Sequence, residues 1–171
     1  MDKRVKLAKD SVESFVRTGS VLSGKSQDDP ELLKPGAVFV TLKIEGELRG
    51  CIGTLMPVRA NLGEEIIYNA ISACRYDPRF EPVTVEELAH LHYEVSVLSE
   101  PVKVESYQEL DPKRYGVIVS KGNRRGVLLP DLEGIDTVEK QVAIACRKGG
   151  ISPQEGPELY RFTTVLYGED E

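Results

Sequence analysis

The sequence predicts an α+β fold in which a mostly antiparallel sheet, built from hairpins, is flanked by about three main helices. Apolar residues alternate with polar ones in several short segments separated by turn residues, which is typical of β-hairpins. Longer segments repeat apolar residues at helical spacing. The strands do not alternate strictly with helices, so a parallel, doubly wound sheet is disfavoured.

The helical segments have capping residues at their ends. Asp2 is placed to cap the first helix and Gly19 to end it, whereas Pro78 limits the second, because a residue before proline avoids helical backbone. Asp136 and Glu139 have the spacing of a capping box at the start of the last helix, and Thr84 and Glu87 have the same spacing at the start of a short helix. The predicted helices cover residues 2–19, 62–74 and 136–149, with shorter ones at 29–33 and 84–90.

The remaining apolar segments predict strands, most of them paired as hairpins. They cover residues 37–44, 48–55, 93–97, 115–120, 126–129 and 159–167. The residues Glu45-Gly46-Glu47 supply the turn of the first hairpin. No linker or internal repeat interrupts the pattern, so residues 1–171 are expected to form a single domain, with a small second lobe around residues 99–130 as an option.

Charge and hydropathy limit the classes of partner and the compartment. The formal net charge is -6, with a pI near 5.1, which disfavours a generic nucleic-acid or anionic-membrane binder. The basic stretch 121–125 is interpreted as a hairpin turn, with a phosphate or nucleic-acid contact as the alternative. No apolar run approaches the ~20 residues that span a bilayer, and residues 1–4 do not resemble a signal peptide. The sequence therefore places the protein in the cytoplasm.

Cysteine and histidine patterns give no sign of a metal or disulfide framework. The three cysteines, Cys51, Cys74 and Cys146, are widely spaced. Cys74 and Cys146 fall on apolar helix stripes, so we expect both to be small buried hydrophobes. His90 and His92 are two residues apart without a cysteine at ligand spacing, so no metal is predicted. Phosphate-binding glycine loops are absent as well, and no cofactor is predicted.

The segment Leu48–Thr54, with the sequence Leu-Arg-Gly-Cys-Ile-Gly-Thr, stands out from its surroundings. Gly50 and Gly53 interrupt a strand, where each glycine costs roughly 0.5 to 1 kcal/mol relative to alanine. Such glycines mark either the approach of a ligand or the close packing of a second backbone. Both interpretations remain open for this segment.

This segment resembles the signature of the AMMECR-type domain family, named after the chromosomal region for Alport syndrome, midface hypoplasia and elliptocytosis. The resemblance covers nearly the whole chain, continuing through residues 36–42, 77–80, 94–98, 128–130 and 146–149. Two departures are Leu-Leu-Pro-Asp-Leu at 128–132 and Lys-Gly-Gly-Ile at 148–151, where the family often has Leu-Leu-Pro-Gln-Val and Lys-Ala-Gly-Leu.

The resemblance implies a mixed, two-lobed α/β fold without a settled biochemical activity. Relatives of this family occur beside, or fused with, radical-SAM proteins and Memo-type proteins that resemble extradiol dioxygenases. The resemblance therefore implies a component of a modification pathway, acting as a catalyst, a carrier or an adaptor, with a radical-SAM or Memo-type protein as partner.

Strand alternation divides the signature into two faces. One set, predicted to line a pocket, is Arg49, Cys51 and Gly53; the other, predicted to face the core, is Leu48, Gly50 and Ile52. A three-residue turn would set Leu48 opposite Ile44 and Cys51 opposite Thr41. A two-residue turn would set Cys51 opposite Val40, among aliphatic residues, because a one-residue slip exchanges the faces of a strand.

The candidate site follows from these positions. Cys51 is the candidate nucleophile or thiol carrier. Arg49 and Arg79 could together bind a small anionic ligand through their guanidinium forks, although a structural contact between Asp77 and Arg79 is the alternative. The full set of candidate ligand-binding residues is Thr41, Arg49, Gly50, Gly53, Thr54, Asp77 and Arg79.

Three classes of function are compatible with this site. The first is a binding or adaptor module that holds a small molecule or a partner without chemistry. The second is an enzyme that uses Cys51 as a thiolate, for which no histidine base is evident in the sequence. The third, a nucleic-acid-associated factor, is opposed by the net charge.

Overall fold

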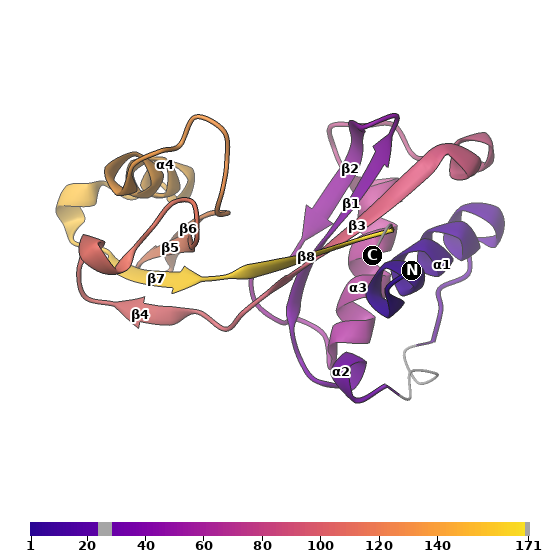
Figure 1. Ribbon diagram of the computed structural model, residues 1–171, viewed down its shortest axis with the longest axis horizontal. Helices are drawn as coiled ribbons and strands as arrows, with labels where there is room; N and C mark the ends of the chain where they lie inside the picture. The colour runs from indigo at the N-terminus through magenta and orange to yellow at the C-terminus, as the bar shows by residue number, and fades with distance from the viewer. Residues whose placement is uncertain (24–28, 170–171) are drawn as a thin grey trace. The chain divides into compact units, whose positions relative to one another are not determined.

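The structure is a computed structural model that describes residues 1–23 and 29–169 (Figure 1). The chain forms two compact units. Unit 1 consists of Met1–Val97 and Val165–Glu171, and unit 2 of Leu98–Thr164. The second unit begins where the sequence suggested a small lobe but extends well past residue 130, because strand β7 near its end pairs with both β4 and β5.

Unit 1 combines a four-stranded sheet with two long helices. The sheet has the order β2-β1-β3-β8. Helices α1 and α3 pack against each other on one face of the sheet (Figure 1). The elements of the sheet are β1 (Ala37–Ile44), β2 (Glu47–Gly53), β3 (Leu91–Leu98) and β8 (Thr164–Gly168), and the helical ones are α1 (Lys3–Thr18), α2 (Pro30–Leu33), α3 (Leu62–Ile71), a π-helix (Ser72–Tyr76) and a 3-10 helix (Val85–His90).

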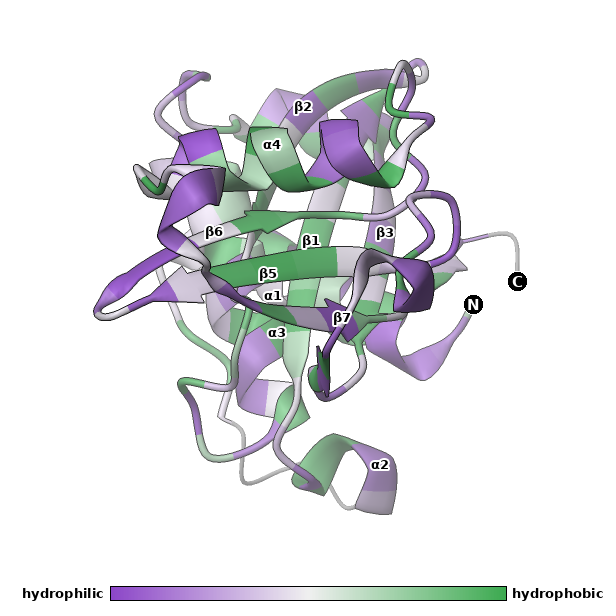
Figure 2. Ribbon diagram, turned by 90° about the vertical axis from the view of Figure 1, so that its left-hand side faces the viewer, coloured by the Kyte–Doolittle hydropathy of each residue, from purple (hydrophilic) through white to green (hydrophobic). Residues whose placement is uncertain are grey.

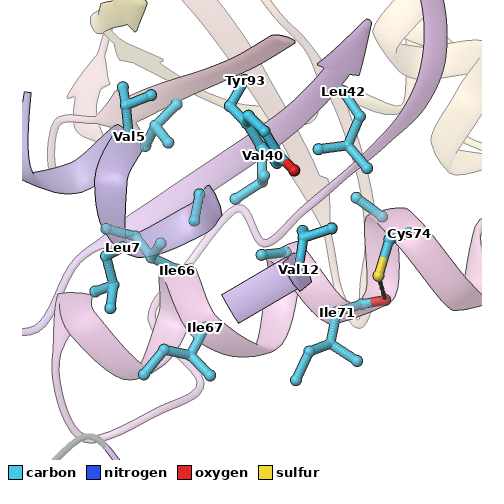
Figure 3. Packing of buried hydrophobic residues seen from close by; sticks show 14 of the residues in the cluster. Val5, Leu7, Val12, Val40, Leu42, Ile66, Ile67, Ile71, Cys74 and Tyr93 are labelled. Atoms are coloured by element: carbon cyan, nitrogen blue, oxygen red, sulfur yellow. Dashed lines mark hydrogen bonds between the residues drawn. The ribbon is translucent and has the colours of Figure 1, made fainter. Parts of the chain in front are cut away.

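The core of unit 1 lies between these helices and the sheet. Figure 3 shows Val40 and Leu42 of β1, Tyr93 of β3 and Val12 of α1 converging on it. All four are almost fully buried. A buried hydrogen bond from the Ser11 hydroxyl to the Ile67 carbonyl, 3.0 Å long, also joins α1 to α3. The core therefore fixes one face of the sheet and leaves the other face free of these helices.

Capping chemistry accounts for most helix boundaries. The Asp2 carboxylate accepts the Arg4 N–H, and Gly19, with φ 76°, ends α1. The Thr84–Glu87 capping box is also present. The last long helix, α4 (Val138–Gly149), is capped by Thr137 and not by Asp136 as predicted, because the Thr137 hydroxyl accepts the Lys140 N–H.

The predicted helix 62–74 is α-helical only to Ile71. It continues as a π-helix, in which Cys74 donates its S–H to the Ile71 carbonyl at 3.3 Å (Figure 3). The wider turn ends in extended backbone at Asp77. Single π-turns often occur at functional sites, and this one delivers Asp77 to the edge of strand β2.

Unit 2 contains a second sheet, with the order β4-β7-β5-β6, and helix α4 packed on β5 and β6. Its strands are β4 (Val102–Val104), β5 (Gly116–Lys121), β6 (Arg124–Leu128) and β7 (Glu158–Phe162). Figure 2 shows β5 as hydrophobic for most of its length and α4 with both apolar and polar residues. Two short 3-10 helices, Tyr107–Glu109 and Pro153–Glu155, complete the unit.

The predicted strand 159–167 is wrong as a single element. It divides into β7 and β8, which belong to different sheets. At the division, the Ser99 N–H donates to the Thr163 carbonyl at 2.9 Å, and the Thr163 N–H donates to the Ser99 hydroxyl at 2.8 Å. Local alternation cannot reveal such a division, because both halves remain extended.

Candidate functional site

The β1–β2 hairpin closes with a two-residue turn and then corrects its own register. Glu45 and Gly46 have φ values of 52° and 80°, as a type I′ turn requires. Lys43 pairs with Leu48, but Leu42 pairs with Gly50, so Arg49 is an extra residue in β2. This β-bulge restores the pairing of Thr41 with Cys51.

The hairpin therefore has the turn length of one alternative and the Cys51 pairing of the other. The turn has two residues, as in the second alternative, yet Cys51 pairs with Thr41, as in the first, and the Leu48–Ile44 pairing of the first alternative does not form. Leu48 does not face the core either, since it is 41% exposed. A β-bulge adds one residue to one strand and so changes the register within the hairpin, which neither turn length alone predicts.

Gly50 is a packing residue. A Cβ atom at this position would lie 2.3 Å from the Ala73 carbonyl oxygen of the π-helix. That contact involves a backbone atom, which cannot rotate away. Glycine at position 50 therefore allows the end of the α3 segment to approach β2, as in the packing interpretation of this glycine.

Gly53 was predicted to line a pocket together with Cys51. In the structure, Gly53 does not leave an empty space beside Cys51. A Cβ atom on Gly53 would lie 2.3 Å from Cγ of Phe39, its partner on β1. The aromatic ring therefore occupies the volume that the missing side chain provides. Aromatic rings commonly cover a glycine across a strand pair, so Gly53 has a structural reason that needs no ligand.

The backbone of Cys51 is held on both sides by residues from outside the sheet. Its N–H donates to the Asp77 carboxylate at 3.0 Å, and its carbonyl accepts from the Arg79 guanidinium at 3.2 Å. Because β2 is an edge strand of unit 1, these groups would otherwise be available to another strand. We call this arrangement the Cys51 clamp, defined by Asp77, Arg79 and the peptide groups of Cys51.

Ion pairing fixes the clamp. Nε and Nη2 of Arg79 donate to the two Asp77 oxygens at 3.0 and 2.7 Å. The Asp77 side chain is only 2% exposed, whereas that of Arg79 is 54% exposed. Hydrogen bonds from Arg79 hold the pKa of Asp77 well below its usual range, against the opposing effect of burial. Asp77 therefore stays a carboxylate, and its charge is balanced by Arg79.

The Cys51 sulfur lies on the same face of the sheet as the side chain of Thr41, its partner on β1. Its hydrogen-bond contact in the described part of the chain is the Thr41 hydroxyl, with an Oγ1–Sγ distance of 3.2 Å. The side chain is partly exposed, in contrast to the buried Cys74 and Cys146. The expectation that those two cysteines are buried hydrophobes is thus confirmed.

Arg49 is engaged by a second carboxylate. Its Nε and Nη2 donate to the two oxygens of Glu87 at 2.8 and 2.9 Å, a bidentate pair. This hydrogen bonding lowers the pKa of Glu87. The Phe80 ring lies 6.0 Å from the Arg49 guanidinium and 5.3 Å from that of Arg79. Both predicted arginine forks are near one ring, and each has an acidic partner.

Thr54 begins a loop that is organised by the buried carboxylate of Glu65. This residue was not among the predicted site residues. Glu65, at 1% exposure, accepts the Thr54 hydroxyl at 2.6 Å and the Arg59 N–H at 2.6 Å. It also accepts the Val58 N–H. The loop that follows the signature is therefore tied to α3 at its start and at its end.

The structure thus groups the predicted residues into two sets. Cys51, Thr41, Asp77 and Arg79 meet at the clamp, whereas Thr54 belongs to the Glu65 loop. Glu87 was predicted only as a capping residue, and no local signal pairs it with Arg49. Glu65 could have been suspected, because it is a charged residue beside the apolar stripe of its helix.

The fold and the clamp define a class of protein: a two-unit α+β protein whose signature strand carries a backbone-anchored cysteine. A family model described as AMMECR1 matches residues 5–167, and so extends across both units. The chain belongs to the AMMECR1 family.

Three relatives illustrate this membership. A Thermotoga maritima protein is 51% identical over 166 residues, covering 95% of each chain. Protein CA_C1420 of Clostridium acetobutylicum is 44% identical, but the match covers 98% of this chain and only 36% of that longer protein. The crystal structure of the uncharacterized protein PH0010 from Pyrococcus horikoshii has a TM-score of 0.85 at 35% identity, covering 98% of this chain and 90% of that one.

Proposed function

We propose that this chain is a binding component of a modification pathway, which recognises a small molecule or a partner protein around Cys51. The observation that carries the proposal is the Cys51 clamp. Asp77 and Arg79 hold the backbone N–H and carbonyl of Cys51, and the Thr41 hydroxyl contacts its sulfur, so the residue is held before any ligand arrives. Such preorganisation favours binding, because little conformational freedom remains to be lost.

The charges around the thiol favour ligand binding over catalysis by Cys51. Asp77 pairs with Arg79, and Glu87 pairs with Arg49, so the four groups form two neutral pairs. The contact of the sulfur is a threonine hydroxyl, which is not a base near neutral pH. A small anionic ligand would therefore use the exposed side of Arg79, since the alternative is to displace a partnered carboxylate.

The proposed setting is the cytoplasm, with a radical-SAM or Memo-type protein as the partner implied by the family resemblance. Cys51, Cys74 and Cys146 are all unpaired thiols, which suits a reducing compartment. Within residues 1–23 and 29–169, no helix is both long and apolar enough to cross a bilayer. The longer Clostridium relative supports a component role, because there the matched region is joined to further sequence.

An enzyme that uses Cys51 as a thiolate is the second candidate. It is favoured by the partial exposure of Cys51 and by the Arg79 guanidinium, which is exposed and bonded to the Cys51 carbonyl. In this mechanism the arginine charge would stabilise the thiolate or a bound anion.

A parallel capture experiment tests the binding proposal. Immobilised wild type, Cys51→Ser and Arg79→Ala are exposed to a cell extract, and retained metabolites and proteins are identified by mass spectrometry. Lys113→Ala, on unit 2, is the control. We expect a ligand that wild type and the control retain and that the two site variants lose. Equal retention by all four proteins would remove the clamp as the binding site.

Alkylation of the folded protein by iodoacetamide across pH separates the two candidates. A Cys51-dependent rate that is already maximal near pH 7 supports the thiolate enzyme. A rate that rises around pH ~8.5, as for an ordinary thiol, or a Cys51 that does not react, supports binding alone. The Cys51→Ser variant assigns the reaction to this residue.

A further inference from the structure

A cavity of about 300 Å³ lies on unit 1, over strands β1, β3 and β8. Its volume is at the lower end of the range for small-molecule sites. Residues of unit 1 line it: Lys43, His92, Tyr93, Glu94, Leu166, Gly168 and Glu169. In Figure 1, β8 is the yellow strand that brings the chain's C-terminal segment into this sheet.

The cavity shares a face of the sheet with the signature cysteine. Lys43 lies two residues after Thr41 on β1, and both alternate with buried Leu42, so they point to the side opposite the core. The Thr41 hydroxyl contacts the Cys51 sulfur on that side. The cavity and the Cys51 thiol therefore lie on the same face of the sheet.

One ion pair and one histidine–carboxylate contact form the polar lining. Lys43 Nζ lies 2.8 Å from Oε1 of Glu94 and 3.3 Å from Oε2. Nδ1 of His92 lies 2.8 Å from the Glu169 carboxylate, which also accepts the Tyr93 N–H at 3.4 Å. Each pair thus joins a carboxylate with a basic side chain across neighbouring segments of the sheet.

The carboxylates are the enclosed members of these pairs. The side chains of Glu94 and Glu169 are 23% and 16% exposed, against 38% for Lys43 and 69% for His92. Counted without His92, the formal charge of the lining is minus one, because Glu94 and Glu169 are offset by Lys43 alone. The negative groups therefore face the cavity from fixed positions, whereas the basic groups are exposed and can move into solvent.

We propose that this cavity binds a small organic molecule that carries a primary ammonium group. The ammonium supplies three donors for the Glu94 and Glu169 oxygens and matches the net charge. Leu166, an exposed apolar side chain in the lining, packs against the carbon chain of the ligand. This inference goes beyond the proposed function, because none of the residues of the Cys51 clamp lines the cavity.

The test uses n-butylamine as the probe, with n-butanol and butyrate as the neutral and anionic analogues of equal chain length. Two-dimensional NMR of the full chain follows the amide signals during titration. We expect n-butylamine to shift the amides of Lys43, Glu94 and Gly168, and the two analogues to leave them unchanged. Shifts by butyrate of the same amides would overturn the proposal.

Matched variants locate the binding. Glu94→Gln and Glu169→Gln should each weaken n-butylamine binding roughly tenfold, because a charged hydrogen bond is lost. Glu86→Gln, on the 3-10 helix of the same unit, should leave the affinity unchanged. Equal weakening by all three would indicate a general surface-charge effect and would refute a specific site.

The result of the n-butylamine titration can be distinguished from the result of the capture experiment that tests the proposed function. If n-butylamine fails to bind while a ligand is still captured in a Cys51-dependent manner, the ammonium assignment alone is wrong. If n-butylamine binds the cavity but no capture depends on Cys51 or Arg79, the cavity stands and the clamp loses its role in recognition. The two experiments use different variants, so neither result decides the other.

Discussion

Cys51 is positioned through its backbone. The residues that hold it come later in the chain, after helix α3 and the π-helix. Asp77 and Arg79 come from the turn after the π-helix, yet they satisfy the N–H and the carbonyl of Cys51. An edge strand normally leaves these groups available. At this residue the side-chain pair takes the place of a neighbouring strand and also prevents another chain from pairing there.

The Asp77→Asn variant tests the energetics of the clamp. Because the folded-state pKa of Asp77 is below the unfolded value of about 3.9, its stabilisation is present above that value. It is lost as the pH falls through the folded-state pKa. We expect Asp77→Asn to lower the free energy of unfolding by about 2 kcal/mol at pH 7, measured by urea denaturation.

The pH dependence supplies the control for this variant. The difference between wild type and Asp77→Asn should shrink as the pH is lowered below about 4. Asp10→Asn is the matched comparison, since Asp10 forms an exposed i,i+4 pair with Lys6 at 2.8 Å. It should cost no more than about 0.5 kcal/mol. An equal loss in the free energy of unfolding for both variants would mean that the burial of Asp77 does not strengthen its contribution to stability.

Gly50→Ala tests whether this signature glycine is required for packing. A methyl group would meet the Ala73 carbonyl at 2.3 Å, so β2 or the π-helix must shift. We expect a loss of about 3 kcal/mol in the free energy of unfolding, measured by chemical denaturation. Gly168→Ala is the control, because a Cβ atom there meets nothing within 4 Å. A stable Gly50→Ala protein would reopen the ligand interpretation of this glycine.

At the scale of elements, the loop after β2 is held by side chains of α3, and Glu65 makes most of these contacts. Glu65 accepts bonds from Thr54, Val58 and Arg59, and Asn69 of the same helix donates to the Val38 carbonyl at 3.0 Å. The helix therefore fixes both the end of the signature strand and the loop that continues from it. The Arg59 guanidinium also lies 3.9 Å from the centre of the Tyr68 ring, a second contact with α3.

Replacing Glu65 with glutamine should release this loop. One carboxylate oxygen becomes an NH₂ group, which cannot accept the bonds of Val58 and Arg59 if it faces them. We expect a loss of about 2 kcal/mol in the free energy of unfolding and faster hydrogen exchange at the Val58 and Arg59 amides. Glu86→Gln, at an exposed position on the 3-10 helix Val85–His90, is the control. Unchanged exchange at both amides would contradict the anchoring role.

Local patterns predicted elements better than they predicted connections. The Asp2 and Thr84 caps and the strand alternation of β1 could be predicted, because each depends on neighbouring residues. The bulge at Arg49 could not be predicted. The two-residue turn sets one register near the turn, whereas the buried side of β2 requires another register further along the hairpin. The Arg49–Glu87 pair was equally inaccessible, because it joins residues 38 positions apart.

At the scale of the whole molecule, the chain builds two separate cores. One contains Val40, Ile66 and Tyr93 of unit 1, and the other contains Val119 and Ala145 of unit 2. Sequence patterning indicated both sets of apolar faces but not their division into two sheets. The division depends on Thr163, where one extended segment leaves the second sheet and enters the first.

Unit 1 is completed only by the last strand of the chain, so its stability depends on residues that follow unit 2. Tyr167 of β8 packs against the unit 1 core, and its ring lies 4.2 Å from the Arg4 guanidinium. Leu166, its neighbour, is exposed. These two adjacent positions on one strand therefore provide a matched pair of substitutions.

We expect Tyr167→Ala to destabilise unit 1 by about 2 kcal/mol, through lost aromatic burial and the lost cation–π contact. Leu166→Ala should cost less than about 0.5 kcal/mol. Native-state hydrogen exchange gives the distribution of the effect. Amides of β1 and β3 should lose protection in Tyr167→Ala, whereas those of β5 should keep theirs, because each unit has its own core. An equal loss in β1 and β5 would show that both units unfold as one cooperative structure.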